Sequence, residues 1–428
     1  MGLRGVTGMV RYFNGSVLTM DGDCALRGHE VWTDGCKIAY VGPAREDAPE
    51  FEREIDLRGG ILMPGFKNAH AHTAMTFVRS YADGLPLQDW LFGKIIPLEG
   101  KLTPEHIYWF TLLGIMEYLT SGITAAFDMY YFRESIARAG MDAGFRTVLC
   151  GGGAEKQVIF DECERYNSVS PLVSYLPGLH AEYTASPADL EAAQELVRAV
   201  KKPFFAHNSE TAREVAECRE RRGGMTPTEF FDSLGLFDYG GGGFHCVHFS
   251  ENDIEIFKKR GLYAVTCPGS NAKLASGIAP LMELLRAGVP LALGTDGASS
   301  NNALDMFREM YLGCVLQKLK AGDAAACPAE DMLRAACCGG AMALGLDSCR
   351  CIAPGMQADM VVIDTDRPSM RPLIDPVRNL VYSGSKDAVC MTVVAGRILY
   401  ENGEFHIGTD AGEIYSRAQR LFKELTGA

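Results

Sequence analysis

Two histidines one residue apart, His70 and His72, follow a Pro-Gly turn in the stretch MPGFKNAHAH at residues 63–72. In an extended segment, side chains at positions i and i+2 point to the same side, so both imidazoles can bind one ion. An HxH pair also arises by chance, and single histidines are commonly surface or satisfied core residues. The remaining ligands of a metal site must therefore come from elsewhere in the chain.

Most of the nine histidines lie, like this pair, at the ends of short apolar segments that are typical of strands. These strand-end histidines are His70, His72, His180, His207, His245 and His248. Asp296 ends the last apolar segment in the same way, and we expect it to complete the ligand set of the HxH pair together with His207. Three imidazoles and one carboxylate suit zinc or ferrous iron with an open position for water, whose pKa then falls towards ~7.

Two further residues at these strand ends could take part in proton transfer. Glu210 follows His207 by three residues, close to the expected metal but outside the ligand set, where a general acid or base is needed. The same position begins the helical stretch SETAREVAECRERR, where an acidic residue also suits the first turn and Ser209 could be the cap. His245 and His248 are three residues apart, so we expect His245 to hydrogen-bond the water and His248 to be structural.

The elements that must position these side chains are apolar strands separated by amphipathic helices. Eight apolar segments follow one another: GGILMPGF, GITAAFDM, FRTVLC, LVSYLPGLH, KPFFAH, GGFHCVH, LYAVTC and VPLALGTD. Continuous apolar strands spaced by helices such as PADLEAAQELVRAVK predict a parallel sheet covered by helices. Eight such strands are the number that a closed (β/α)₈ barrel of the TIM type requires, and the C-terminal strand ends of that barrel meet at one face.

The two ends of the chain have a different pattern. VRYFNGSVLTMDGD near the N-terminus and AVCMTVVAGRILYENGEF near the C-terminus are short alternating segments with turn residues between them, which is typical of β-strands. We predict an α/β fold in which both ends form one small β-sandwich. Its first part is residues 1–62, the metal-dependent catalytic barrel is residues 63–347, and residues 348–428 supply the second part and a C-terminal helix.

The composition narrows the class of protein. A chain of 428 residues is long enough for a large barrel with a smaller attached domain. Its 41 basic and 54 acidic residues give a net charge of −13 without a basic stripe, which argues against nucleic acid as a partner. No segment approaches the ~18 apolar residues of a membrane span. The 14 cysteines lack CxxC spacing and we find no secretory signal, so we expect reduced thiols and a cytoplasmic location.

Six stretches together resemble the amidohydrolase superfamily, and more narrowly its S-adenosylhomocysteine/5′-methylthioadenosine deaminase branch. They are PGFKNAHAHTAM, DWLFGKIIPLE, HNSETAREV, HCVHFSENDI, SNAKLASGIAP and LGTDGASSNNALDMFREM. The ordered set HxH, HxxE, HCVH and GTDG carries the resemblance to the superfamily. The Trp-Leu segment that ends in Pro-Leu-Glu carries the resemblance to the nucleoside-type branch, and the likeness spans nearly the whole chain.

The resemblance implies one divalent ion, zinc or ferrous iron, and no organic cofactor. Its implied ligands are His70, His72, His207 and Asp296. The implied reaction converts an adenosine to an inosine: water attacks the ring carbon that bears the amine, Glu210 moves a proton to the ring nitrogen, and ammonia leaves. Asp296 and His245 stabilise the tetrahedral intermediate.

The resemblance also assigns the substrate contacts. Glu99 accepts hydrogen bonds from the ribose hydroxyls, Trp90 shapes the pocket above it, and His180 and Glu210 contact the substrate. From the residues alone, Glu99 would as readily be a solvated loop acid and Trp90 a core residue. The implied substrates are 5′-methylthioadenosine, 5′-deoxyadenosine, adenosine and S-adenosylhomocysteine, and a homo-oligomer is what the family suggests.

Two departures from the branch bear on specificity. Members that accept homocysteine are expected to have arginines after the third barrel strand, to bind its carboxylate. Here that strand runs into Gly151, Gly152 and Gly153, and Lys156 could substitute only as a point charge. Cys267 stands where family members often carry Asn. The first departure makes S-adenosylhomocysteine the least expected of the four substrates.

Three alternatives remain open from the sequence. The same metal site serves deaminases and hydrolases of other heterocycles, such as guanine, cytosine or a triazine. A barrel without activity could act as a binding protein, although here all expected ligands are present together. A structural metal site is disfavoured because such sites are closed and rich in cysteine, whereas Cys150, Cys246 and Cys267 lie singly on three strands.

Overall fold

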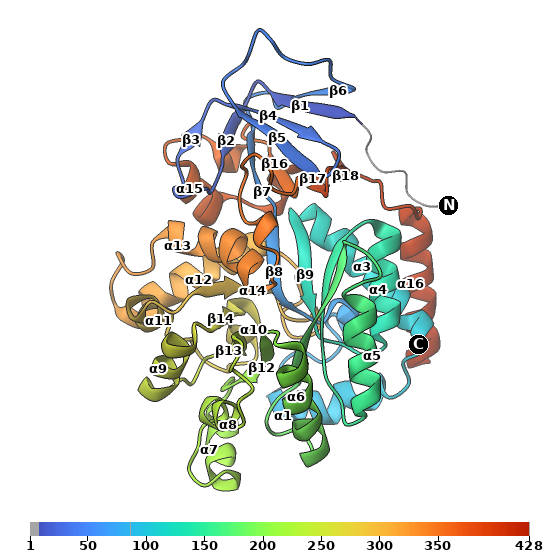
Figure 1. Cartoon of the computed structure of the whole chain (residues 1–428), viewed down its shortest axis with the longest axis vertical. Coiled ribbons are helices and arrows are strands. Elements are labelled where there is room, and N and C mark those ends of the chain that lie inside the picture. Colours follow the sequence, from blue (N-terminus) through green and yellow to red (C-terminus); the bar gives the residue numbers. More distant parts are fainter. Residues whose placement is uncertain (1–7, 86, 428) are drawn as a thin grey trace.

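The computed structural model describes residues 8–85 and 87–427, and its centre is a barrel of eight parallel strands (Figure 1). Each strand pairs with the next in chain order, which confirms the predicted (β/α)₈ fold of the TIM type. The strands are β8 (Phe66–Ala71), β9 (Ile123–Asp128), β10 (Arg146–Gly151), β11 (Val173–Leu179), β12 (Phe204–Asn208), β13 (Gly241–His245), β14 (Tyr263–Thr266) and β15 (Leu291–Leu293).

Helices connect the barrel strands and cover the barrel (Figure 1). Several begin at capping boxes: Ser186 caps the helix that Pro187 begins, and Ser250 caps the helix that Glu251 begins. The helices between β9 and β15 are α4 (Arg133–Ala143), α5 (Lys156–Tyr166), α6 (Pro187–Val200), α7 (Ala212–Arg221), α8 (Pro227–Ser233), α9 (Glu251–Arg260), α10 (Pro268–Lys273) and α11 (Leu281–Ala287).

A series of short helices and one long helix fills the connection from β8 to β9. It consists of η1 (Thr73–Val78), α1 (Leu87–Trp90), η2 (Leu91–Ile95), α2 (Ile96–Glu99) and α3 (Pro104–Thr120). After β15 the chain forms α12 (Met306–Ala321), α13 (Ala329–Arg334), η3 (Ala335–Gly339), α14 (Gly340–Ala343) and η4 (Asp347–Cys349). In the described part of the chain, every helix is too short or too polar to cross a membrane.

Hydrogen bonds between buried polar groups join the last barrel strand to the first. Asn68 donates to the hydroxyl of Thr295 at 2.7 Å and accepts from its backbone N–H at 2.9 Å. Just beyond, the N–H of Asp296 donates to the carbonyl of His70 at 3.0 Å. The expected carboxylate ligand is therefore tied directly to the strand that carries the HxH pair.

Strands from both ends of the chain form two sheets, as the sequence predicts. One sheet has the order β5 (Lys37–Gly42), β4 (Glu30–Asp34), β1 (Met9–Phe13), β6 (Arg53–Asp56). The other has the order β19 (Glu404–Phe405), β18 (Arg397–Glu401), β17 (Val389–Val394), β16 (Met360–Ile363), β7 (Ile61–Pro64), β2 (Ser16–Leu18), β3 (Leu26–Arg27). A shared apolar core that includes Tyr12, Val31, Leu62 and Val393 packs the two sheets together.

The remaining elements lie near the C-terminus. They are η5 (Pro368–Met370), α15 (Pro376–Arg378), η6 (Asn379–Ser383), η7 (Lys386–Ala388) and α16 (Ala411–Thr426). Helix α16 is the predicted C-terminal helix, and it lies against the barrel beside α3 (Figure 1).

The first barrel strand differs from the prediction. GGILMPGF was expected to be that strand, but Ile61–Pro64 is β7, which pairs with β16 and β2 of the end sheet. The barrel strand begins only after Gly65, where an added Cβ would lie 2.2 Å from the side chain of Thr124. Both strands are buried throughout, so the apolar run GGILMPGF gave no sign of a break at Gly65. The domain limits at residues 62 and 347 stay a prediction.

A buried ion pair links the barrel to the end sheets and yields a stability prediction. Arg146 of β10 binds Asp359 through two hydrogen bonds of 2.8 and 2.9 Å, with both side chains almost fully buried. Arg146→Met leaves a buried carboxylate without its partner, so we expect the free energy of unfolding in urea to fall by about 3 kcal/mol.

Arg165→Met is the matched control, because Arg165 pairs with Glu134 in an exposed salt bridge. Its loss should cost about 0–1 kcal/mol. Equal small effects of both substitutions would contradict the structural role of the buried pair.

Candidate active site

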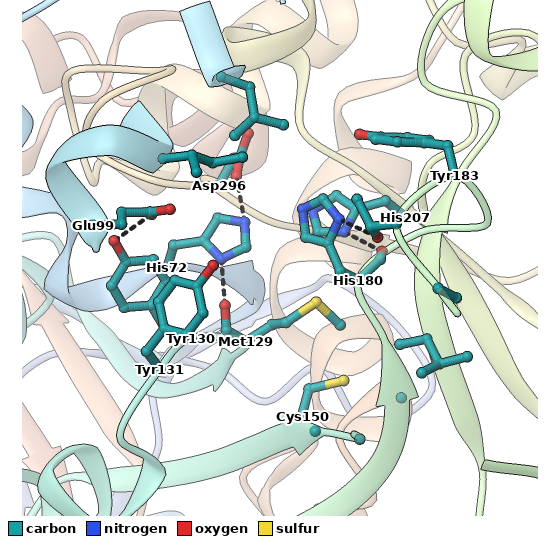
Figure 2. A pocket seen from close by; sticks show the side chains of 18 of the residues that line it. His72, Glu99, Met129, Tyr130, Tyr131, Cys150, His180, Tyr183, His207 and Asp296 are labelled. Atoms are coloured by element: carbon teal, nitrogen blue, oxygen red, sulfur yellow. Dashed lines mark hydrogen bonds and ion pairs between the residues drawn. The ribbon is translucent and has the colours of Figure 1, made fainter. Parts of the chain in front are cut away.

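The side chains that were expected to hold a metal meet at the C-terminal ends of the barrel strands. Figure 2 shows His72, His207 and Asp296 of this group. Nε2 of His70 lies 3.5 Å and Nε2 of His72 lies 3.3 Å from Oδ1 of Asp296. His207 joins the same pair, with ligand atoms of all three histidines within 4.8 Å of one another. Strands β8 and β12 and the loop after β15 thus bring together four groups that can hold one divalent ion.

Hydrogen bonds on the far side of three of these side chains fix which atom of each faces the expected metal position. Nδ1 of His72 donates to the carbonyl of Met129 at 2.5 Å, and Nδ1 of His207 donates to the carbonyl of His180 at 2.6 Å (Figure 2). Both rings therefore keep the lone pair of Nε2 free. Asp296 accepts from the hydroxyls of Ser270 and Ser300 on Oδ2, at 2.6 and 2.8 Å, which leaves Oδ1 facing the histidines.

His70 shows that these residues fit a metal ion. Its side chain is fully buried and stacks on Phe244, yet neither ring nitrogen finds a hydrogen-bond partner among the described residues. Burial lowers the pKa of His70 to about 3 and that of His207 well below its ordinary value, so both imidazoles are neutral, the form that binds metals. An unpaired buried imidazole is costly unless it binds a ligand such as a metal ion.

Glu210 and His245 lie beside this centre. Oε2 of Glu210 is 3.8 Å from Nε2 of His245, and its Oε1 accepts from the hydroxyl of Ser276 at 3.3 Å. Burial raises the pKa of Glu210. Nδ1 of His245 contacts Oδ1 of Asn271 at 2.8 Å, and the backbone of His245 is left-handed at φ +72°, a strained conformation that is common at functional sites.

The turn that carries Glu210 differs from the expected helix start. The N-cap of α7 is Thr211 rather than Ser209, so Glu210 precedes the helix. Glu214 accepts hydrogen bonds from the backbone N–H groups of Ser209, Glu210 and Thr211 at 3.1, 2.7 and 3.4 Å. The capping box of Thr211 and Glu214 was visible as a T-x-x-E pattern, and it explains how Glu210 is held outside the helix.

A cavity of about 320 Å³ opens from this centre, in the size range of small-molecule sites. All the expected substrate contacts line it: Trp90, Glu99, His180 and Glu210. Glu99 accepts a hydrogen bond of 2.5 Å from the hydroxyl of Tyr130, and burial raises its pKa (Figure 2). His180 faces the cavity with its ring 4.6 Å from that of His207.

Several residues of the site were missed from the sequence, and others lie elsewhere. Tyr130, Tyr183 and Arg133 line the cavity, but no local pattern marked them. Lys156 binds Glu191 and Glu195 instead of lining the cavity, so it cannot replace the absent arginines. His248 contacts the carbonyl of Ser276 at 2.7 Å, and Cys267 is fully buried at the start of α10.

The fold agrees with comparisons to known proteins. The sequence profile of the Amidohydrolase family matches residues 61–399, and the chain belongs to this family. A 5-methylthioadenosine/S-adenosylhomocysteine deaminase of Pelotomaculum thermopropionicum is 40% identical over 420 residues, which cover 95% of this chain and 96% of that protein.

Two solved structures extend the comparison. The crystal structure of an adenosine deaminase from Xanthomonas campestris with bound zinc matches with a TM-score of 0.91 and 32% identity, covering 98% of both chains. An atrazine chlorohydrolase from Arthrobacter aurescens TC1, complexed with zinc, has a TM-score of 0.89 at 22% identity and covers 96% of this chain and 100% of its own. The likeness to the chlorohydrolase concerns the fold alone. Since a deaminase and a chlorohydrolase share this fold, the fold does not determine which bond is hydrolysed.

The ligand cluster predicts how the protein binds a metal. His207→Asn and His70→Asn should each lower the zinc retained after dialysis from about one equivalent per chain to well below half. Loss of a group that only hydrogen-bonds to a ligand already costs about 10- to 100-fold in affinity, and loss of a ligand costs more. Elemental analysis by mass spectrometry measures the stoichiometry. His406→Asn, at an exposed position far along the chain, is the control and should retain zinc like the wild type. Full zinc content in both ligand variants would contradict the cluster as the binding site.

Proposed function

We propose that this protein is a metal-dependent hydrolytic deaminase of adenosine-type nucleosides, releasing ammonia and the corresponding inosine. One observation carries the proposal: a single cavity joins the histidine–aspartate cluster to half-buried Glu99 and its partner, buried Tyr130. The cluster suits water activation, and the carboxylate suits a polyhydroxylated group. The deaminase names of relatives at 35–40% identity support the same class of reaction.

The ion that this site would hold is zinc, with ferrous iron as the second choice. His70, His72, His207 and Asp296 would bind it, since three imidazoles and a carboxylate match the ligands that zinc prefers. A bound ion of this kind supplies a water molecule with its pKa lowered towards ~7. The zinc of the deaminase from Xanthomonas campestris supports this choice.

Glu210 acts as the proton carrier. As a carboxylate it accepts a proton from the attacking water and passes it to the ring nitrogen of the base, while the water oxygen bonds to the carbon that bears the amine. Its raised pKa makes this transfer easier in both directions. Glu210, again a carboxylate, then takes the proton of the new hydroxyl group on that carbon and gives it to the amine, so that the carbon–nitrogen bond breaks, the carbonyl forms and ammonia leaves.

His245 orients the water and stabilises the charge that develops on its oxygen. The contact with Asn271 holds the imidazole with Nε2 towards Glu210, so this atom points at the place where the water must lie. Asp296 sits at the same point and, with its second oxygen held by two serine hydroxyls, keeps a fixed orientation through the reaction.

The rest of the cavity binds the nucleoside. Glu99, already oriented by Tyr130, accepts hydrogen bonds from the two ribose hydroxyls, and buried Trp90 forms the apolar wall beside it. His180 contacts the base, because it lies next to His207 and is open to the cavity. A small-molecule nucleoside is therefore the partner that this site takes. The homo-oligomer suggested by the family stays a prediction.

Replacement of the proton carrier gives the direct test. Glu210→Gln should keep about one zinc per chain but lower kcat for 5′-methylthioadenosine by about 10²–10⁴-fold, because an amide cannot carry the proton. Ammonia release measures kcat, and Glu217→Gln at the surface of α7 is the control. Retained turnover in Glu210→Gln, or ammonia from guanine or cytosine but from no adenosine, would contradict the assignment.

The ribose contact can be tested separately from catalysis. Glu99→Gln should raise KM for adenosine by about 10-fold, because a charged acceptor for two hydroxyls is replaced by a neutral one. KM for 2′,3′-dideoxyadenosine, which lacks both hydroxyls, should change by less than about 2-fold. Steady-state kinetics on the two substrates provides the comparison, and equal effects on both would show that Glu99 does not bind the ribose.

A further inference from the structure

The wall of the cavity away from the metal ligands is built from glycines and one arginine. Cys150 marks this side, well apart from Asp296 (Figure 2), and Gly151, Gly152 and Gly153 follow it. Arg133, at the start of α4, lies over Gly151: an added Cβ there would be 2.9 Å from both Cδ and Nε of the arginine. The side chain of Arg133 therefore fills the space that any side chain at position 151 would need.

The charge of Arg133 is already balanced. Its Nε donates to Oε2 of Glu162 on α5 at 2.8 Å, and its Nη2 lies 2.7 Å from the same oxygen. The two side chains are only 19% and 20% exposed, so water screens the pair weakly. Although burial opposes the charged form, the hydrogen bond that Arg133 donates to Glu162 raises the pKa of Arg133 above its ordinary value.

The other charged side chains of the cavity are carboxylates. They are Glu99, Asp189, Glu210 and Asp296. Arg133 is the single arginine or lysine among the described residues that line the cavity. The cation expected to compensate, Lys156, has its ammonium group between Glu191 and Glu195 on the outer surface.

We propose that this cavity selects nucleosides whose 5′ carbon carries an uncharged group and discriminates against a 5′ tail that bears a carboxylate. The inference rests on the proposed function, which places the base at the histidines and the ribose at Glu99. The 5′ substituent then extends towards Arg133 and the glycines. A carboxylate there loses its hydration and meets an arginine that is already paired with Glu162.

The test uses two nucleosides of equal size that differ in charge. They are 5′-(3-carboxypropyl)thioadenosine and its carboxamide, measured beside 5′-methylthioadenosine and S-adenosylhomocysteine on the zinc-loaded wild type. We expect kcat/KM for the carboxamide and the methylthio compound to exceed that for the two carboxylates by about 10-fold or more.

Two results would overturn the inference while leaving the proposed deaminase activity intact. Equal kcat/KM for acid and carboxamide would show that the cavity accepts the negative charge. Poor turnover of both, beside good turnover of the methylthio compound, would show that size decides instead. Absence of ammonia from every adenosine would overturn the proposed function, and this inference with it.

A pair of substitutions tests the role of Glu162. Glu162→Gln leaves Arg133 in place with an uncompensated charge, so the acid-to-carboxamide ratio of kcat/KM should rise by about 5-fold or more. Glu134→Gln is the matched control, because Glu134 and Arg165 form a second ion pair between the same two helices, exposed and outside the cavity lining. An unchanged ratio in Glu162→Gln would contradict the proposal that this pair cancels the charge of Arg133.

Discussion

The rest of the molecule depends on one contact, which closes the barrel. It joins the residues that follow the last strand, β15, to the first strand, β8. Asn68 and Thr295 close the barrel, and one residue later the backbone of Asp296 binds that of His70. Because of this closure, a carboxylate and an HxH pair that are more than 220 residues apart share one point in space. Without closure, the ligands on β8 and after β15 would lie at opposite edges of an open sheet.

The polar groups around this point hold the side chains of the site in fixed orientations. The carbonyls of Met129 and His180 set the tautomers of His72 and His207, and serine hydroxyls hold the far oxygen of Asp296. Further out, Glu214 holds the turn of Glu210 through three backbone N–H groups. Both ring nitrogens of His70 lack a hydrogen-bond partner in the described part of the chain, so the site is organised for an ion before the ion binds.

Much of this arrangement could be predicted because parallel barrels collect their strand ends at one face. Histidines at the ends of apolar segments were enough to identify His70, His72 and His207 as neighbours, and the eight segments predicted the barrel. The strand boundary near Gly65 was missed, since residues 61–71 are buried throughout and the close packing of Gly65 against Thr124 leaves no sign in the local sequence. Arg133 could not be found either, because its place in the cavity depends on the absence of a side chain at Gly151, and no local pattern records this relation between helix α4 and strand β10.

The measurement that tests the central claim most directly is X-ray absorption at the zinc edge of the zinc-loaded protein. The account predicts one zinc environment with only nitrogen and oxygen ligands, at roughly 2.0–2.2 Å, and with the scattering pattern of imidazoles. Sulfur ligands at roughly 2.3 Å would contradict it, because they would move the metal to the cysteines and leave the histidine–aspartate cluster without its ion.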